Sequence, residues 1–311
     1  MLKVEKKVVY KAFGFSIISE IPLSELPQLG NKVDSNIDIV ITREELKNQW
    51  SDLANKDKGF VIQKNLMLYK YEEIAIFLVQ DGRKISVSPL KDYDEDIAKL
   101  VILGTCLGTI LMQRKILPLH GSAIAINGKA YAIIGDSGAG KSTLASAFLN
   151  EGFHLLTDDL IALSISEENV PYINPAYPQQ KLWEDSLCNF GMDKRNYNSI
   201  YGRETKFNVP VTSQYSSKAI PLGGILELVR TENGDIQLEE IQGLKGLDTI
   251  YRNTYRNFII PKLGMMDWHF YQSTIILNKV NLYRLSRPTT KFNAPQLVSK
   301  ILQTIGGNND D

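Results

Sequence analysis

The first ninety residues alternate short hydrophobic runs with polar turns, a pattern typical of β-strands. Three β-rich runs occupy residues 60–62 and onward, 74–79 and 84–87. Asp81-Gly82 lies between the last two runs and favours a hairpin, because both residues tolerate positive φ angles. Two earlier runs, VVYKAFGFSIISEIPL and IDIVIT, predict further strands. We therefore expect a small, mainly β domain over residues 1–92.

The hydrophobic period then changes to that of a helix, which we expect over residues 93–115 as a connecting segment. Asp92 or Asp94 can cap this helix. Its uncharged stretch, residues 100–113, is shorter than the about 20 residues that span a bilayer, so a buried helix is expected. The positions that repeat are Ile97, Leu100, Val101, Leu107 and Leu111, and Arg114 and Lys115 close the C-terminal end.

An α/β pattern follows. Strands are predicted at 122–126 and 130–134 around an Asn127-Gly128 turn, then a helix at 141–150 and a strand at 154–157. His120 is expected just before the first of these strands. Further on the pattern is weaker. It predicts helices at 181–192, 247–258 and 294–305, strands at 207–211, 224–229, 236–239 and 281–285, an Asn233-Gly234 hairpin, and a disordered tail at 306–311.

Composition narrows the function classes. Lys+Arg and Asp+Glu are equal at 35 each, so no overall charge favours nucleic acid or an anionic membrane as a partner. The two cysteines, Cys106 and Cys188, form no CxxC pattern, which argues against a zinc site or a disulfide scaffold and fits a reducing compartment. The N-terminal residues lack the apolar run of a signal peptide. We therefore expect a cytoplasmic protein.

The string GDSGAGKST, residues 135–143, satisfies the phosphate-loop pattern and lies between a predicted strand and a predicted helix. Its glycines let backbone N–H groups turn toward a phosphate, and the helix N-terminus adds positive potential. Lys141 can reach the β- and γ-phosphates, and the Ser142 hydroxyl can bind Mg²⁺. The alternative is a glycine-rich turn without a ligand. The expected ATP-binding residues are Gly135, Ser137, Gly138, Ala139, Gly140, Lys141, Ser142 and Thr143.

Asp158 and Asp159 follow the predicted strand 154–157, and ligands of open α/β sheets bind at the carboxyl ends of strands. One carboxylate can hold Mg²⁺ while the other accepts a proton from an attacking hydroxyl. A single metal-binding aspartate beside a surface neighbour is the alternative. His120 taken alone suits a structural role. The chain contains no NKxD motif for guanine and no HRD or DFG motif of eukaryotic-type protein kinases.

Residues 120–159 resemble the catalytic domain of the HPr serine kinase/phosphorylase family. The resemblance rests on the His120-Gly121 pair, the GDSGAGKS loop and the Asp158-Asp159 pair, in that order and spacing. It implies a P-loop kinase domain over residues 93–305, with a mixed sheet and flanking helices. It also implies ATP with Mg²⁺ (or Mn²⁺) as cofactors.

The same resemblance implies roles for individual residues. Asp158 would be the general base for a substrate serine, and Asp159 would hold Mg²⁺ with Ser142. His120 would lie beside the base and tune it, and Lys141 would stabilise the transferred phosphoryl group. Lys206, in the segment KFNVPV, would lie near the phosphates. One departure is clear, because NPAYPQQKLWEDS stands where the HPr-specific enzymes carry an E-[IV]-R-G-x-G signature.

Segments outside this core resemble the HPr-kinase-like enzymes of lasso-peptide biosynthesis. They are YKAFGFSIISEIPLSEL, QRKILPLHGSAI, KLW, YRNTYRN and LYRLSRP. This resemblance implies a kinase that phosphorylates a serine of a precursor peptide, at the C-terminal residue in some members. It leaves homo-oligomer formation open.

Two basic groups are candidates for binding the substrate. Arg252 and Arg256, with Tyr251 and Tyr255, would form an aromatic-basic patch on one predicted helix, suited to a carboxylate or a phosphate. A solvated helix face is the alternative. Arg203 belongs to a second group, with Arg195 and Lys206, which either flanks the active site or is ordinary surface charge.

The leading expectation is therefore an ATP- and Mg²⁺-dependent kinase that phosphorylates a serine of a peptide. Two alternatives remain open. One is a true HPr kinase/phosphorylase that acts on a carrier protein. The other is a non-catalytic protein that uses ATP as a switch, which would bind the nucleotide without releasing ADP in response to an acceptor.

Overall fold

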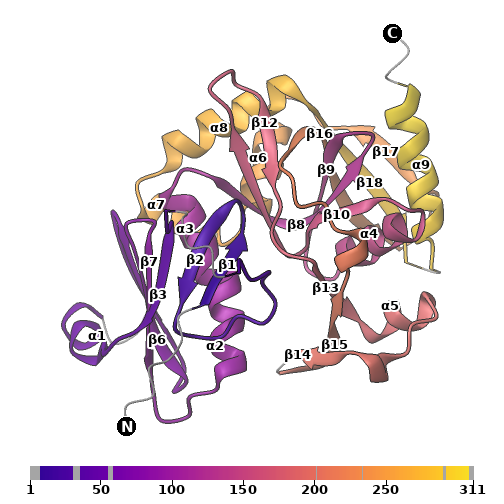
Figure 1. Ribbon diagram of the computed structural model, residues 1–311. Helices are drawn as coiled ribbons and strands as arrows, with labels where there is room; N and C mark the ends of the chain where they lie inside the picture. The colour runs from indigo at the N-terminus through magenta and orange to yellow at the C-terminus, as the bar shows by residue number, and fades with distance from the viewer. Residues whose placement is uncertain are drawn as a thin grey trace. The chain divides into compact units, whose positions relative to one another are not determined.

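The computed structural model describes residues 8–30, 36–54, 59–200, 202–232, 234–289 and 292–307 (Figure 1). The chain divides into two compact units. Unit 1 comprises the chain up to Pro118 together with Arg256–His269, and unit 2 comprises Leu119–Tyr255 and the chain from Phe270 onward. Among the described residues, no helix is long and apolar enough to cross a membrane.

Unit 1 is built on a sheet of seven strands within its described part, in the order β1-β2-β3-β7-β6-β5-β4. Its β4 to β7 portion is an antiparallel meander, whereas β3 pairs in parallel with β2 and β7. The strands are β1 (Val8–Ala12), β2 (Phe15–Ser19), β3 (Ile39–Arg43), β4 (Phe60–Gln63), β5 (Leu66–Tyr71), β6 (Ala75–Gln80) and β7 (Lys84–Pro89). The predicted mainly β character of this region is confirmed.

The predicted hairpin between β6 and β7 is also present. Asp81 and Gly82 have φ angles of 53° and 61°, the left-handed geometry that a tight hairpin turn requires. The Gly82 N–H donates to the side chain of Gln113, and the Arg114 guanidinium donates to the Gly82 carbonyl. The turn is therefore fastened to the end of the helical segment that follows the sheet.

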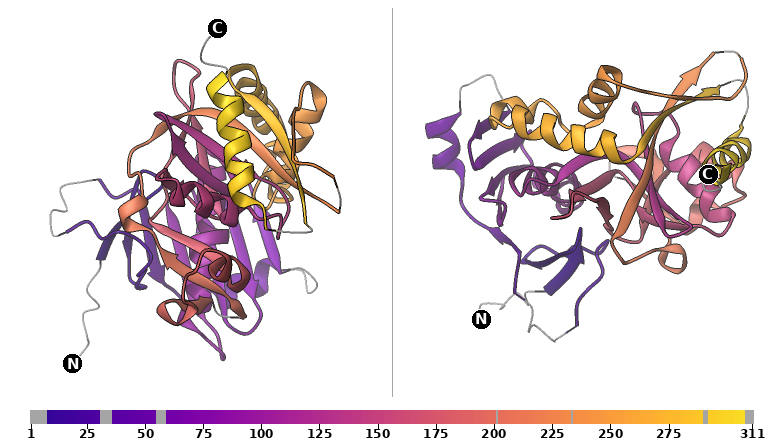
Figure 2. Two further views of the ribbon diagram at one scale, coloured as in Figure 1. Left: turned by 90° about the vertical axis from the view of Figure 1, so that its right-hand side faces the viewer. Right: turned by 90° about the horizontal axis from the view of Figure 1, so that it is seen from above.

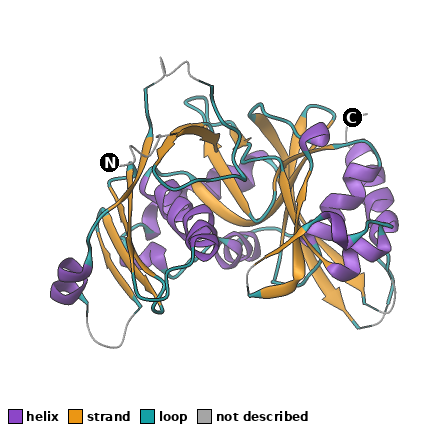
Figure 3. Ribbon diagram, turned by 60° about the horizontal axis from the view of Figure 1, so that its bottom comes forward, coloured by secondary structure: helices purple, strands orange, loops and turns teal. Residues whose placement is uncertain are grey.

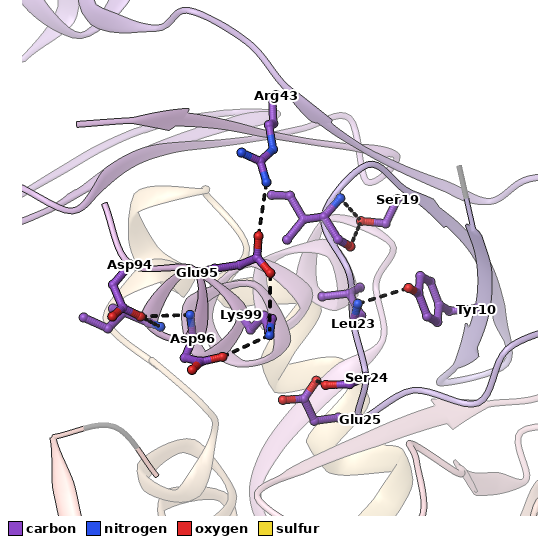
Figure 4. Close-up of polar contacts among 12 residues, drawn as sticks. Tyr10, Ser19, Leu23, Ser24, Glu25, Arg43, Asp94, Glu95, Asp96 and Lys99 are labelled. Atoms are coloured by element: carbon purple, nitrogen blue, oxygen red, sulfur yellow. Dashed lines mark hydrogen bonds and ion pairs between the residues drawn. The ribbon is translucent and has the colours of Figure 1, made fainter. Parts of the chain in front are cut away.

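That helical segment runs without interruption from Glu95 to Gln113. It consists of α2 (Glu95–Val101), a π-helical stretch (Ile102–Cys106) and α3 (Leu107–Gln113). The Asp94 carboxylate accepts hydrogen bonds from two first-turn N–H groups, so Asp94 is the cap (Figure 4). Two short helices complete unit 1, α1 (Lys47–Leu53) and α7 (Ile259–Lys262).

A network of side chains near this cap connects the helix to the sheet. The Arg43 guanidinium lies 3.2 Å from the Glu95 carboxylate, and the Lys99 ammonium lies 3.0 Å from Asp96 and 3.8 Å from Glu95 (Figure 4). Because these groups are partly exposed, each pair contributes at most about 1 kcal/mol. The apolar face of the helix, including Ile97, is buried and supplies most of the packing.

Unit 2 contains a mixed sheet of eight described strands, with the order β10-β8-β11-β12-β16-β18-β17 and β9 between β8 and β16. β9, β16 and β18 are parallel to one another, and β8 is antiparallel to β9. The strands are β8 (Leu117–Ile126), β9 (Lys129–Ile134), β10 (His154–Thr157), β11 (Leu160–Ile165), β12 (Pro171–Asn174), β16 (Ile220–Thr231), β17 (Gln237–Glu240) and β18 (Asn281–Pro288). Figure 3 distinguishes the strands from the helices of each unit.

Helices flank this sheet. α4 (Lys141–Asn150) and α9 (Ala294–Gly307) lie side by side on one face of it (Figures 1 and 2). Their buried side chains, such as Phe148 and Leu297, join sheet residues such as Leu226 in one core. Unit 2 also contains α5 (Glu184–Asn189), α6 (Leu244–Asn253) and 3₁₀ turns at Lys194–Asn196 and Thr212–Gln214. α8 (Met266–Lys279) begins in unit 1 and continues into unit 2 after His269. The expected α/β fold, a mixed sheet with flanking helices preceded by a mainly β region, is confirmed.

A small antiparallel sheet stands apart from the large one, with the order β13-β15-β14. Its strands are β13 (Gln179–Trp183), β14 (Asn198–Ile200) and β15 (Arg203–Pro210). The helix predicted over 181–192 is therefore wrong in its first part. Residues 179–183 alternate buried Gln180 and Leu182 with half-buried and exposed neighbours, which is the two-residue period of a strand, and the helix begins only at Glu184.

Other boundaries also differ from the sequence-based ones. Residues 93–118 belong to unit 1, so the division falls after Pro118 and not after residue 92. The helix predicted at 247–258 ends at Asn253, and Arg256 adopts a φ of 49°. α7 and α8 have no counterpart in the prediction. Gly306 and Gly307 belong to α9, while the rest of the predicted tail, like Asn233 of the predicted hairpin, lies outside the described residues.

Candidate active site

The GDSGAGKST segment forms a loop between the end of β9 and the start of α4. Gly135 has a φ of 139°, which L-residues avoid, and a Cβ atom on it would overlap the backbone carbonyl oxygen of Leu228 on β16. Glycine is thus required at the first position of the loop by the close approach of a neighbouring strand. The strand–loop–helix context that the phosphate-loop pattern requires is present.

Lys141, the first residue of α4, folds back over this loop. Its ammonium donates hydrogen bonds to the carbonyls of Gly135 (2.8 Å) and Asp136 (2.9 Å). Burial lowers the pKa of the ammonium, and the carboxylates of Asp158 and Asp159 partly oppose this shift. The buried cation is therefore held at the loop by backbone carbonyls and two nearby carboxylates.

Asp158 lies beside the phosphate loop and is buried, with three hydrogen-bond donors around its carboxylate. The hydroxyls of Ser122 (2.5 Å) and Ser142 (2.9 Å) donate to Oδ1, and the backbone N–H of Lys181 (2.8 Å) donates to Oδ2. The loop serine thus contacts Asp158. That Ser142 and Asp159 hold the metal together stays a prediction. The chain turns at Asp159, with a φ of 76°, and the side chains of the two aspartates have different neighbours.

Asp159 faces a histidine and a lysine. Its Oδ2 lies 2.8 Å from the Lys181 ammonium, and its Oδ1 lies 3.6 Å from Nδ1 of His120, which also lies 3.0 Å from the Asp159 backbone oxygen. Burial alone would raise the pKa of this carboxyl, but the charge of the Lys181 ammonium and its hydrogen bond outweigh burial and hold the pKa well below its usual range. Asp159 is an ionised carboxylate at neutral pH.

The charges and burial around Asp159 also shift the pKa values of its partners Lys181 and His120. Burial would lower the pKa of Lys181, but the Asp159 charge overcomes it and raises the pKa above the ordinary lysine value. Burial and the nearby charge of Lys141 lower the pKa of His120, against the opposing effect of Asp159. His120 is therefore neutral at pH 7, and it lies within β8, not before the first strand of the sheet as predicted.

One cavity of about 410 Å³ in unit 2 joins these groups, a volume typical of small-molecule sites. It brings together the loop, Lys141, both aspartates and His120. Lys206, predicted near the phosphates, also lines it. From β15, its ammonium lies 5.4 Å from the centre of the Trp183 ring on the paired strand β13. Among the predicted loop residues, those that line the cavity are Ser137, Gly138, Gly140, Lys141, Ser142 and Thr143.

The predicted substrate-binding arginines Arg252 and Arg256 belong to different units. Arg252 lies on α6, where its guanidinium pairs with Asp248 (2.8 Å) and approaches Glu227 (3.9 Å), and it is not among the lining residues. Arg256 belongs to unit 1, with its guanidinium over the rings of Phe60 and Tyr69. Because α6 ends at Asn253, the expected single helical patch does not form. The Arg203 side chain lies outside the described residues.

Sequence reasoning missed Ser122, Lys181 and Arg287, all of which line the cavity. Lys181 was assigned to a helix, although the alternation in QQKLW is a weak strand signal that could have placed it. Ser122 directly follows the His120-Gly121 pair. Arg287 is 128 residues beyond Asp159, and only strand pairing brings it near the loop.

Comparison with known proteins adds a local similarity. No family model matches this chain. It is 36% identical over 69 residues to the HPr kinase/phosphorylase of Mycoplasmopsis pulmonis, a match that spans 22% of this chain and 22% of that protein. The solved structure of the HPr(Ser) kinase/phosphatase from Coxiella burnetii aligns with 62% of this chain and 99% of its own, at 15% identity and a TM-score of 0.35. Over the 69 matched residues, the chain is similar to an HPr kinase/phosphorylase.

Proposed function

We propose that this protein is a kinase that uses ATP and Mg²⁺ to phosphorylate a serine hydroxyl of a peptide. The observation that carries the proposal is the cavity that joins the phosphate loop to two aspartates and a histidine. Phosphoryl transfer needs mainly positioning and electrostatic stabilisation, and this set of groups can supply both. A protein that only binds a nucleotide needs the loop but has no use for a second, half-buried carboxylate with its own lysine and histidine.

Mg²⁺ suits the oxygen atoms next to the loop. The Ser142 hydroxyl and the Asp158 carboxylate are 2.9 Å apart, and both are hard oxygen ligands. Among the described residues, no group of three or more His, Cys, Asp or Glu side chains could hold a metal alone. This agrees with Mg²⁺, which uses one or two protein ligands plus phosphates and water. When held by these two oxygens, the ion would supply positive charge against the negative charge that develops during phosphoryl transfer.

We therefore assign the metal to Ser142 and Asp158, and the acceptor hydroxyl to Asp159. This reverses the two aspartates relative to the roles that the family resemblance implies. Its support is the hydrogen bond from Ser142, which goes to Asp158, and the ion pair from Lys181, which goes to Asp159. With its low pKa, Asp159 would orient the hydroxyl in the ground state and take its proton as the new O–P bond forms.

His120 would complete the acceptor side. Its Nδ1 faces the Asp159 backbone oxygen, which fixes the orientation of the ring. Because the ring is neutral, it adds no positive charge that would compete with Lys181 for the Asp159 carboxylate. Lys141 would stabilise the negative charge of the transferred phosphoryl group, after moving from the Gly135 and Asp136 carbonyls toward the phosphates.

For the acceptor, we propose a serine of a lasso-peptide precursor, as the resemblance of the outer segments implies, with the C-terminal serine as the first candidate. The segment 174–186, which departs from the HPr-specific signature, contains β13 and the start of α5 and lines the cavity through residues that include Lys181, Trp183 and Ser186. Because this part of the cavity lining differs in sequence from the HPr-specific enzymes, it suits an acceptor other than HPr.

HPr itself is the second candidate acceptor. The observation that favours it is the similarity over 69 residues to the enzyme of Mycoplasmopsis pulmonis, whose name states kinase and phosphorylase activities on HPr. Since the match covers 22% of that protein, the carrier protein and the phosphorylase reaction remain proposals for this chain.

The test is an acceptor panel. The full chain is incubated with ATP and Mg²⁺ and with a precursor peptide, the same peptide with its terminal serine changed to alanine, or HPr. ADP release and the mass of each acceptor are measured. We expect ADP release that depends on the serine peptide, with a mass gain of one phosphate group. Nucleotide binding without acceptor-dependent ADP release from any of the three would contradict the proposal.

A further inference from the structure

Two arginines lie on the opposite side of the phosphate loop from the aspartates. Arg230 near the end of β16 and Arg287 near the end of β18 are direct partners in the parallel register of these strands. β16 in turn runs parallel to β9, which leads into the loop. Asp158 and Asp159 follow β10, which is attached through β8 to the other edge of β9. The loop is therefore flanked by carboxylates on one side and by guanidinium groups on the other.

Both guanidinium groups approach glycines of the loop. Arg287 donates from Nε to the Ala139 carbonyl (2.7 Å), and a Cβ atom on Gly140 would lie 3.2 Å from its Nη2. The Arg230 Nη1 would lie 3.9 Å from a Cβ atom on Gly138. Arg287 also lines the cavity that contains Lys141 and Ser142. Its remaining N–H donors are close to the place where a phosphate on this loop would be bound.

The pair is electrostatically unusual. Burial lowers the pKa of Arg287, and the neighbouring charge of Arg230 lowers it further. Within the part of the chain that the structure describes, no carboxylate forms an ion pair with either guanidinium. Arg284, three residues earlier on β18, has such a partner, because it makes two hydrogen bonds to the Glu227 carboxylate. Two like charges held together without an acid partner are stabilised when an anion binds between or beside them.

We propose that Arg287, assisted by Arg230, binds the polyphosphate of the nucleotide on this loop, which gives the site a second cationic arm besides Lys141. This inference rests on the proposed function, because it concerns the nucleotide that the kinase would use. Arginine suits the role, since its planar fork donates two N–H groups to one phosphate and stays charged under all physiological conditions. Arg287 would touch the substrate, while the exposed Arg230 would act mainly through its charge.

The test compares polyphosphates with nucleosides. Calorimetry measures the binding of ATP, inorganic tripolyphosphate and adenosine to the full chain and to the variants Arg287→Gln, Arg287→Lys and Arg230→Gln. Lys279→Gln is the control, because it removes an exposed charge of unit 2 that does not line the cavity. The Gln variant keeps an N–H that can reach the Ala139 carbonyl, so a purely structural role of Arg287 would survive it, whereas a charge-dependent role would not.

We expect Arg287→Gln to bind ATP and tripolyphosphate about 10- to 100-fold more weakly, as the loss of one charge-assisted hydrogen bond implies, with adenosine binding unchanged. Arg287→Lys should recover part of the loss, and Arg230→Gln should show the same selectivity with a smaller effect. Wild-type affinity of both Gln variants for tripolyphosphate would overturn the inference, as would an equal loss of adenosine. A different result would contradict the proposed function itself, namely that the wild-type protein binds neither ATP nor tripolyphosphate.

Discussion

Replacing each aspartate by asparagine separates the two proposed carboxylate roles. Asp158→Asn removes one negative charge next to Ser142 and Lys141 but keeps the size of the side chain. Its three neighbours can still be satisfied, because the amide oxygen can accept from the Lys181 N–H while the hydroxyls of Ser122 and Ser142 accept from the amide nitrogen. We therefore expect the free energy of unfolding to change by no more than about 1 kcal/mol.

The effect on the metal is larger. A polar contact to a charged group contributes about 1.5–3 kcal/mol, so its loss corresponds to about 10- to 100-fold in affinity. Mg²⁺ should strengthen ATP binding by a certain factor, the ratio of the ATP dissociation constants without and with Mg²⁺. We expect this factor to be about 10- to 100-fold smaller in Asp158→Asn than in the wild type. Asp159→Asn should keep the factor, because its carboxylate contacts Lys181 and His120, not the loop serine. Both variants should lose phosphoryl transfer.

The assay is a titration of each variant with ATP, in Mg²⁺ and in a chelator, and the result is the ratio of the two dissociation constants. Asp193→Asn serves as the matched control, since Asp193 is exposed, pairs with Arg195 and does not line the cavity. If Asp159→Asn lost the Mg²⁺ effect while Asp158→Asn kept it, the assignment would be refuted, and the roles implied by the family resemblance would stand.

Three further predictions concern Gly135 of the phosphate loop, Lys181 beside Asp159, and His269, a buried histidine of unit 1. Gly135→Ala should abolish the ATP-dependent rise in melting temperature, because the added Cβ meets the Leu228 carbonyl at a φ of 139°; a normal rise would contradict the strand contact. Lys181→Met should move the acid limb of the pH–rate profile to higher pH, because the pKa of Asp159 rises when its ammonium partner is lost. An acid limb at the wild-type pH would show that Asp159 does not accept the proton. His269 is buried, and burial lowers its pKa to about 4, so the unfolded chain binds the extra proton first and stability falls as the pH drops below about 6.5. Between pH 7 and pH 5, His269 lowers the free energy of unfolding by about 2 kcal/mol. Urea unfolding at both pH values should therefore show a weaker pH dependence in His269→Gln than in the wild type.

The phosphate loop and α4 can be predicted from the sequence because their signals are local. The loop needs glycine at Gly135 for a backbone reason, and α4 runs over the predicted residues, Lys141–Asn150. The hairpin at Asp81-Gly82 and the cap at Asp94 are equally local, since each depends on the conformation of one or two residues. Short-range rules are sufficient at such places.

The different contacts of Asp158 and Asp159 could not be predicted in the same way. Asp158 and Asp159 are chemically identical neighbours, and what distinguishes them is contact with residues far along the chain. Lys181 reaches Asp159 only because residues 179–183 form a strand, and the pattern that would have shown this is five residues long. Arg287 depends on the pairing of β16 with β9 and β18, which no local signal specifies.

The helix around Arg252 and Arg256 shows the limit of periodicity. The spacing places both on one helical face, yet the helix ends at Asn253 and Arg256 takes a left-handed backbone conformation over the rings of Phe60 and Tyr69. Tertiary contacts within unit 1 override the local preference there.

Transfer of the γ-phosphoryl group to a peptide serine is the central claim, and labelled ATP tests it directly. The full chain is incubated with Mg²⁺, ATP labelled in its γ-phosphoryl group, and a precursor peptide that ends in serine, with the alanine version of the peptide beside it. The account predicts that the label appears on the serine of the first peptide, not on the second, and that the Lys141→Ala variant transfers none. Label released only as inorganic phosphate, or label that stays on ATP while ATP binds, would contradict the account.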